Sequence, residues 1–221
     1  MEIKPVAYFR SPLPEKFGTP RQAGLAPSVP GEVRLAEGIS PEVLDGLDGF
    51  ERIWLIWEFS LNKGECSPKV RPPRLGGNRR IGVFATRSPY RPNPLGLSTV
   101  KIASVDAAKG LIRVLGADLV DGTPIYDIKP YIPYADSHPD ARAGFVDEKA
   151  WEPLEVLIPE DIPGYGMLEE EDLRALRELL SLDPRPQYQD DPSREYGLGY
   201  KKINVRFRVE GRTLTVTSVD R

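Results

Sequence analysis

Short stretches in which apolar and polar residues alternate recur along the first 130 positions of the chain. They are rich in Val, Ile, Phe and Trp, and Gly, Pro or Asp stands at their ends, which predicts β-strands. We expect these strands at residues 4–10, 50–59, 81–86, 98–105, 111–115 and 125–129, with residues 106–110 connecting a hairpin. Residues 40–47 favour one or two turns of helix after a Ser-Pro start. Many strands joined by short loops indicate a mainly β protein, either a barrel or a sandwich.

The last third of the chain follows a different pattern. Residues 169–182 place Leu173, Leu176 and Leu180 on one face and acidic residues in the first turn, which predicts a helix. Residues 203–209 and 213–219 alternate cleanly, and a tight hairpin turn fits between them. We therefore expect two parts, a β domain over residues 1–140 and a small α+β domain over residues 141–221.

Composition narrows the class of protein. The chain has 221 residues, 40% of them hydrophobic, with 3 Trp, 9 Tyr and 7 Phe, which is enough to form a core. Its apolar runs are too short for a membrane helix, and its first residues lack the pattern of a secretory signal. The single Cys66 and the single His138 exclude an internal disulfide and the usual zinc sites. We expect a cytoplasmic protein that has no membrane segment and no metal.

The charge is unevenly distributed. The whole chain carries −3, yet residues 63–91 contain eight basic residues against Glu65 alone, a local charge of +7. Such a cluster on an acidic protein is typical of a surface that binds a polyanion. A solvated basic loop is the other interpretation, and charge by itself does not separate the two.

Prolines restrict the backbone conformation of this basic region. The chain has 23 prolines, and residues 82–98 carry Arg87 and Arg91 in a loop with three of them. A loop ordered in advance presents a charged group at a lower cost in entropy. Guanidinium groups there suit a carboxylate or a phosphate. The alternative is a Pro-rich turn with exposed arginines.

A second candidate segment, residues 118–136, concentrates carboxylates and tyrosines near strand ends. Asp127 and Lys129 are two residues apart, so in a strand they share a face and could form an ion pair. An aromatic ring beside a carboxylate suits a flat nucleobase. The ring stacks on the nucleobase, and the carboxylate accepts a proton or a hydrogen bond from it. A structural turn with a buried Asp–Lys pair is the alternative.

Several catalytic classes are excluded. The sequence has no phosphate-binding loop, no dinucleotide glycine fingerprint and no nucleophile elbow. Any chemistry must come from positioning, from Arg, Lys, Asp and Tyr side chains, and from a bound cofactor. The polar arm at residues 11–24 is a weaker candidate for wrapping a small ligand.

These segments together resemble the TsaA-like family of tRNA methyltransferases, also called TrmO. The resemblance is carried by the motifs Lys16-Phe-Gly-Thr-Pro-Arg-Gln22, Val70-Arg-Pro-Pro-Arg-Leu-Gly-Gly-Asn78, Phe84-Ala-Thr-Arg-Ser-Pro89 and Asp121-Gly-Thr-Pro124 with Asp127-Ile-Lys-Pro-Tyr131. Asp183-Pro-Arg-Pro186 and Asn204-Val-Arg-Phe-Arg-Val209 extend it into the second domain. It implies a single-sheet β-barrel with a C-terminal α+β domain.

The resemblance also implies a cofactor and the residues that bind it. Members bind S-adenosylmethionine and form homodimers. Carried over by position, the cofactor pocket consists of Gln22, Ala23, Gly24, Asn62, Lys63, Arg87, Leu97, Gly122, Thr123, Pro124 and Ile125. Some members have His-Gln in place of Asn62-Lys63.

The reaction implied is methylation of the exocyclic nitrogen of threonylcarbamoyladenosine, next to the anticodon in the stem-loop of certain tRNAs. The candidate catalytic residues are Asp127, Tyr126 and Tyr131, with Lys129 holding Asp127 ionised. The basic stretch 63–91 would contact tRNA phosphates. Two alternatives stay open, a non-catalytic module that binds RNA or a small ligand, and a methyltransferase with another acceptor.

Overall fold

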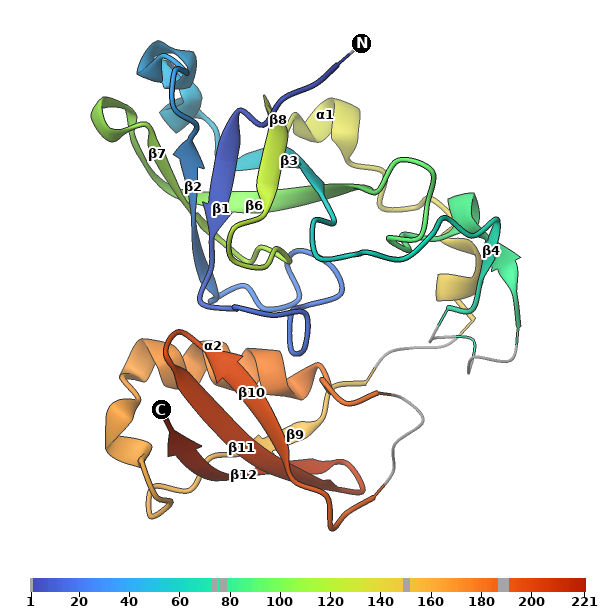
Figure 1. The fold of residues 1–221 in the computed structure, drawn as a ribbon, viewed down its shortest axis with the longest axis vertical. Helices are drawn as coiled ribbons and strands as arrows, with labels where there is room; N and C mark the ends of the chain where they lie inside the picture. Colours follow the sequence, from blue (N-terminus) through green and yellow to red (C-terminus); the bar gives the residue numbers. More distant parts are fainter. Residues whose placement is uncertain (1, 73–74, 76–78, 149–151, 187–190) are drawn as a thin grey trace.

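The first structural unit is a closed barrel of six antiparallel strands. It is seen in a computed structural model that describes residues 2–72, 75, 79–148, 152–186 and 191–221. The strands run in the order β1-β2-β7-β6-β3-β8, and β8 pairs again with β1 (Figure 1). Their bounds are β1 Ala7–Arg10, β2 Pro30–Leu35, β3 Arg52–Glu58, β6 Leu95–Asp106, β7 Leu111–Leu115 and β8 Pro124–Pro130. The mainly β, single-sheet barrel expected from the resemblance is confirmed.

The alternation of the sequence explains the interior of this barrel. On β3, Ile53, Leu55 and Trp57 point inward and are buried, while the residues between them point outward. Their neighbours in the core include Phe9 and Ile125 from the strands on either side of the closure. Burial of each such side chain contributes about 1.5–3 kcal/mol, which makes this core the main source of stability in the barrel.

Two strands of the barrel, β2 and β6, have a glycine at an inward position, where an aromatic ring from a neighbouring strand packs directly against the backbone. A Cβ at Gly31 of β2 would lie 2.2 Å from the Phe9 ring, and one at Gly96 of β6 would lie 2.3 Å from the Trp57 ring. Large rings therefore occupy the space of the missing side chains. Because glycine occupies an inward position of β2, the sequence of this strand lacks the alternation of apolar and polar residues. For this reason β2 was not among the predicted strands.

One strand prediction was wrong. Residues 81–86 were expected to form a strand, but only Ile81–Gly82 do so, as β5, paired with Lys69–Val70 as β4. The chain then turns through a 3-10 helix at Val83–Ala85. The amide and the hydroxyl of Thr86 both donate hydrogen bonds to the Val83 carbonyl, at 3.0 and 2.8 Å. These two hydrogen bonds favour the turn over an extended strand.

The second unit is a four-stranded sheet covered by one helix. The sheet has the order β10-β11-β12-β9, with β12 and β9 parallel and the other pairs antiparallel. The bounds are β9 Glu155–Leu157, β10 Tyr196–Tyr200, β11 Ile203–Glu210 and β12 Thr213–Asp220, and the helix is α2 Glu170–Ser181. The predicted helix and hairpin are confirmed. A single further turn, α1 Pro133–Asp136, follows the barrel.

The N-terminal arm between β1 and β2 joins the two units. Leu13, Ala26 and Val29 are buried in the core of the C-terminal unit, together with α2 and the sheet. The amide and the hydroxyl of Ser28 both donate to the Glu178 carboxylate of α2, each at 2.7 Å. In Figure 1, α2 accordingly lies on the side of its sheet that faces the barrel. None of the described helices has the length and apolar character needed to cross a bilayer.

Candidate functional site

A broad groove of about 2710 Å³ lies where the barrel, the basic loop and the C-terminal unit meet. Its walls come from the N-terminal arm, the ends of β3 and β6, residues 67–72, residues 80–93 and residues 182–186. A small-molecule pocket usually measures about 300–1,000 Å³. The groove therefore has room for a small ligand and for part of a larger substrate.

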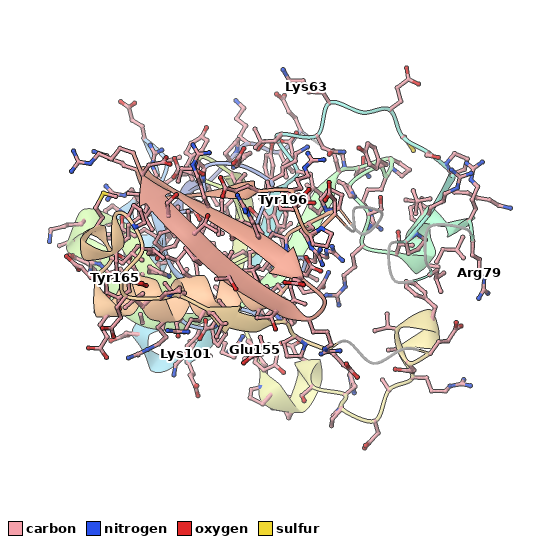
Figure 2. All side chains as sticks on the ribbon, turned by 90° about the horizontal axis from the view of Figure 1, so that it is seen from below. Lys63, Arg79, Lys101, Glu155, Tyr165 and Tyr196 are labelled. Atoms are coloured by element: carbon pink, nitrogen blue, oxygen red, sulfur yellow. The ribbon has the colours of Figure 1, made fainter. Side chains whose placement is uncertain are left out.

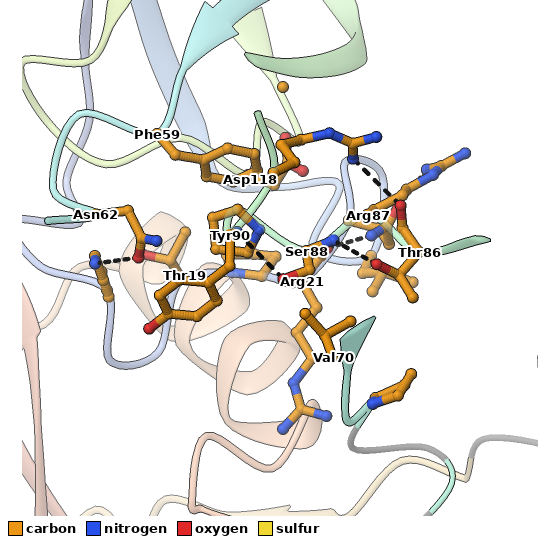
Figure 3. Close-up of a pocket in the computed structure, with 18 of the residues that line it drawn as sticks. Thr19, Arg21, Phe59, Asn62, Val70, Thr86, Arg87, Ser88, Tyr90 and Asp118 are labelled. Atoms are coloured by element: carbon orange, nitrogen blue, oxygen red, sulfur yellow. Dashed lines mark hydrogen bonds between the residues drawn. The ribbon is translucent and has the colours of Figure 1, made fainter. Parts of the chain in front are cut away.

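The arginine loop is held rigid on one wall of this groove. Ser88 donates its amide to the Thr86 hydroxyl at 3.2 Å, and Arg91 folds back to the Thr86 carbonyl at the same distance. Figure 3 shows Thr86, Arg87, Ser88 and Tyr90 gathered in this loop. The Arg87 guanidinium reaches across to the N-terminal arm and donates to the Gln22 side-chain oxygen. Two segments implied by the resemblance are thus joined by one hydrogen bond.

Asp118 connects these segments to β6. The Ser98 hydroxyl donates to Asp118 Oδ1 at 2.5 Å, and the indole N–H of Trp57 donates to the Ser98 oxygen at 2.9 Å. Burial raises the pKa of the Asp118 carboxyl, while the Ser98 hydrogen bond, the Arg87 charge and the Ala23 amide oppose this shift. A carboxylate on the groove wall is therefore surrounded by parts of the arm, the arginine loop and β6.

The structure brings together about half of the predicted cofactor residues. Gln22, Asn62, Arg87, Leu97 and Thr123 line the groove, although Thr123 is buried and bonds the Val120 carbonyl. Asn62 accepts a hydrogen bond from Lys16 at 2.8 Å, also drawn in Figure 3. The structure does not test cofactor binding by any of them.

The remaining predicted cofactor residues lie outside the groove lining. Gly24 and Gly122 are exposed and adopt positive φ angles of 83° and 78°, which fits tight turns. Lys63 is exposed and points away from the body of the molecule (Figure 2), Pro124 begins β8, and the Ile125 side chain is in the barrel core. Ala23 is next to the groove through its amide, which bonds Asp118.

The predicted catalytic residues lie on β8 or directly after it, outside the groove lining. Asp127 and Lys129 form the expected ion pair at 2.8 Å, and both side chains are substantially exposed rather than buried. Tyr131 packs against Trp54 with 5.7 Å between ring centroids. Such an exposed ion pair is screened by water and stabilises the fold little.

Tyr126 is the exception, because its hydroxyl reaches a residue of the groove. It donates to Glu58 Oε2 at 2.5 Å, and Glu58 lines the groove at the end of β3. This hydrogen bond, with burial and the Glu58 charge, raises the pKa of Tyr126 to about 12. Sequence reasoning missed Glu58, because an acidic residue at an outward strand position has the pattern of an ordinary solvent-exposed residue. Asp118 belongs to the predicted segment 118–136, whose several carboxylates the sequence does not distinguish.

The basic stretch contributes to the groove unevenly. Lys69, Arg71, Arg80, Arg87 and Arg91 line it, whereas Arg74 lies outside the described residues. Arg79 is not one of the groove residues; it lies at the edge of the molecule in Figure 2, 3.6 Å from a Glu148 oxygen. In the described part of the chain, Lys69, Arg71 and Arg80 have no carboxylate within ion-pair distance. Nowhere among the described residues do three or more His, Cys, Asp or Glu side chains gather as a metal site requires.

Comparison with known proteins shows that both parts of the chain are similar to one family. The model described as "tRNA-methyltransferase O N-terminal domain" matches residues 8–137, and "TrmO C-terminal domain" matches residues 154–221. The tRNA (adenine(37)-N6)-methyltransferase of Escherichia coli (strain K12) is 40% identical over 218 residues, 94% of this chain and 93% of that protein. A Pseudomonas aeruginosa protein named "Putative S-adenosylmethionine-dependent methyltransferase RcsF" is 40% identical over 213 residues, 93% of this chain and 91% of that protein. The solved structure of TrmO from P. aeruginosa matches with a TM-score of 0.83 at 30% identity, covering 100% of this chain and 98% of the other.

Proposed function

The chain belongs to the tRNA-methyltransferase O family, and from this premise we propose that it methylates the exocyclic nitrogen of threonylcarbamoyladenosine next to the tRNA anticodon. S-adenosylmethionine is the methyl donor. The observation that carries the proposal is the groove in which the arm, the arginine loop and Asp118 converge, because it is larger than the donor alone requires. The alternative of a non-catalytic binding module is not favoured, since the relatives matched over most of their length are named as methyltransferases.

The residues of the groove fit the chemistry of the donor. Arg87 offers a cation to its carboxylate, and Asp118 offers an anion to its ammonium group. The Leu97 side chain, 57% exposed, and the Phe59 ring offer apolar surface to its adenine. When bound, the donor supplies a methyl group that is already activated on a sulfonium sulfur, so the chain must supply positioning and a base rather than a nucleophile.

The same groove accounts for the larger substrate. Lys69, Arg71 and Arg80 form a basic wall that suits the phosphates of the anticodon stem-loop, and unstacked loop bases are usually read by aromatic stacking. The C-terminal unit forms the opposite wall through Leu182 and Arg212. Because the substrate is tRNA, we expect the protein to act in the cytoplasm.

We further propose that the protein acts as a homodimer. Phe84 is 77% exposed and lies on the groove wall, where a second copy could cover it. Sedimentation that shows a dimer at micromolar concentration would support this state. A monomer throughout that range would contradict it.

Mass spectrometry of tRNA nucleosides from a deletion strain tests the function. We expect the methylated form of threonylcarbamoyladenosine to disappear and the unmethylated form to accumulate, with reversal on re-expression. Loss of a different methylated nucleoside would indicate another acceptor. An unchanged nucleoside profile would support the non-catalytic module.

A further inference from the structure

A strip of side chains crosses the outside of the barrel beside the groove. Because Trp57 points inward, its neighbour Glu58 points outward, directly opposite Leu95 of β6 and diagonal to Leu97. Residues paired in this way have Cβ atoms about 4.5–5.5 Å apart, and diagonal neighbours are about 7–8 Å apart. Glu58 is therefore adjacent to Leu97, one of the predicted cofactor contacts.

A bulge in the barrel brings a tyrosine to Glu58 from the other side. Asp127 of β8 pairs with Ile56, but Trp57 pairs with Ile125, so Tyr126 is the extra residue on its strand. Bulges of this kind redirect a side chain, and here the Tyr126 hydroxyl meets Glu58 Oε2 at 2.5 Å. Tyr126 keeps its proton near neutral pH, because its pKa is raised to about 12. It therefore acts as a fixed donor that holds the carboxylate in one orientation.

The second oxygen of Glu58 is not engaged by the residues that the structure describes. The described residues place no hydrogen-bond donor on Oε1, while Oε2 is engaged by Tyr126. Glu58 is half-buried and lines the same groove as Asn62, Arg87 and Leu97. An oriented, acceptor-only oxygen at that place can receive a proton from a bound substrate.

We propose that Glu58 is the general base of the methyl transfer and that Tyr126 is its positioning residue. This inference rests on the proposed function. The acceptor nitrogen gives its proton to Glu58 Oε1 and forms the new bond to the methyl carbon with its electron pair. The pair of the broken carbon–sulfur bond stays on sulfur, which becomes a neutral thioether. The carbamoyl group makes the nitrogen proton more acidic, so a carboxylate is a sufficient base.

The rival carboxylate is less well placed. Asp127 is paired with Lys129 at 2.8 Å, also bonds the Ile128 amide at 2.9 Å, and does not line the groove. Both of its oxygens are therefore engaged along β8. Glu58 combines a bound orientation with a free oxygen, which Asp127 does not.

Methyl transfer under single turnover with saturating S-adenosylmethionine and threonylcarbamoylated tRNA tests the assignment. We expect Glu58→Gln to lower the rate constant by about 10²–10⁴-fold, the usual contribution of a general base, with little change in the Kd of either substrate. Tyr126→Phe should lower it about tenfold with the Kd of both substrates unchanged, because the carboxylate loses the donor that holds its orientation. Glu32→Gln is the matched control, an outward carboxylate on β2 that pairs with Arg34 and Arg113 and should leave the rate unchanged.

Several results would overturn the assignment. A folded Glu58→Gln variant that keeps the wild-type rate within about threefold, or that loses only affinity for the donor, removes Glu58 as the base. If Asp127→Asn loses the rate while Glu58→Gln keeps it, the base is on β8. If Glu58→Gln does not fold, a Tyr126→Phe variant whose rate is unchanged, or which loses substrate affinity alone, contradicts the proposal. A wild-type protein that transfers no methyl group to this tRNA refutes the proposed function instead.

Discussion

Replacing Ser98 by Ala should lower the free energy of unfolding by about 3 kcal/mol near neutral pH. The Ser98 side chain is buried, with 2% of its surface exposed, and its hydroxyl serves two partners. It accepts from the Trp57 indole at 2.9 Å and donates to Asp118 at 2.5 Å. A buried donor left without a partner costs about 1–3 kcal/mol, and a hydrogen bond to a charged group contributes about 1.5–3 kcal/mol.

The loss should depend on pH in a defined direction. Burial raises the pKa of Asp118 in the folded protein, so its contribution to stability is fully present below the unfolded pKa and is lost as the pH rises through the folded pKa. The Ser98 hydrogen bond opposes that shift by favouring the charged carboxylate. Ser98→Ala removes it, so the deficit should be larger above the folded-state pKa of Asp118 than below it, where the protonated carboxyl leaves mainly the cost at Trp57.

Urea unfolding followed by tryptophan fluorescence across a series of pH values measures this deficit. Ser104→Ala, at an exposed position of the same strand, is the control and should change stability by less than about 0.5 kcal/mol. In a Trp57→Phe background, Ser98→Ala should cost at least about 1 kcal/mol less, because the orphaned donor is gone. A deficit below about 1 kcal/mol, or strict additivity of the two changes, would refute the reasoning.

Three further predictions concern the donor site, the shared core and the RNA surface. Arg87→Ala should weaken S-adenosylmethionine binding by about 1–3 kcal/mol in calorimetry, and unchanged binding would remove Arg87 from the site. Leu13→Ala should destabilise the C-terminal unit by about 2–5 kcal/mol, because Leu13 is fully buried in its core; unchanged hydrogen exchange of α2 would contradict this. Charge reversal at Arg71 and Arg80 should reduce tRNA affinity and flatten its log–log salt slope by about 0.7–0.9 per lost phosphate contact. Arg206→Glu should leave that slope nearly unchanged, since Arg206 is paired with Asp220 at 2.6 Å; a change with Arg206→Glu alone would place RNA capture in the C-terminal unit.

The sequence predicts elements whose alternation is carried by side chains. The segments that became β3, β7 and β11 have large apolar residues at every inward position, so their pattern is complete. In β10, glycines occupy the positions between Tyr196, Leu198 and Tyr200. A Cβ at Gly199 would lie 3.1 Å from Pro14, so the reason for that glycine is a tertiary contact that the local sequence does not reveal.

The candidate site was likewise predictable only where the signal lies in the local sequence. The motif around Arg87 could be recognised because its prolines and arginines have an unusual composition, and the spacing of Asp127 and Lys129 predicted their ion pair correctly. The roles of Asp118 and Glu58 depend on partners 20 and 68 positions away, Ser98 and Tyr126, which are brought close by the pairing of β6 with β7 and of β3 with β8. A bulge decides the second contact, and a one-residue irregularity in register has no local signature here.

Transfer of a radiolabelled methyl group from S-adenosylmethionine to two matched tRNA preparations tests the central claim most directly. One preparation carries the threonylcarbamoyl group beside the anticodon, and the other is the same tRNA without it. We predict stoichiometric incorporation into the first and none into the second. Equal incorporation into both, or none into either, would contradict the function assigned to this groove.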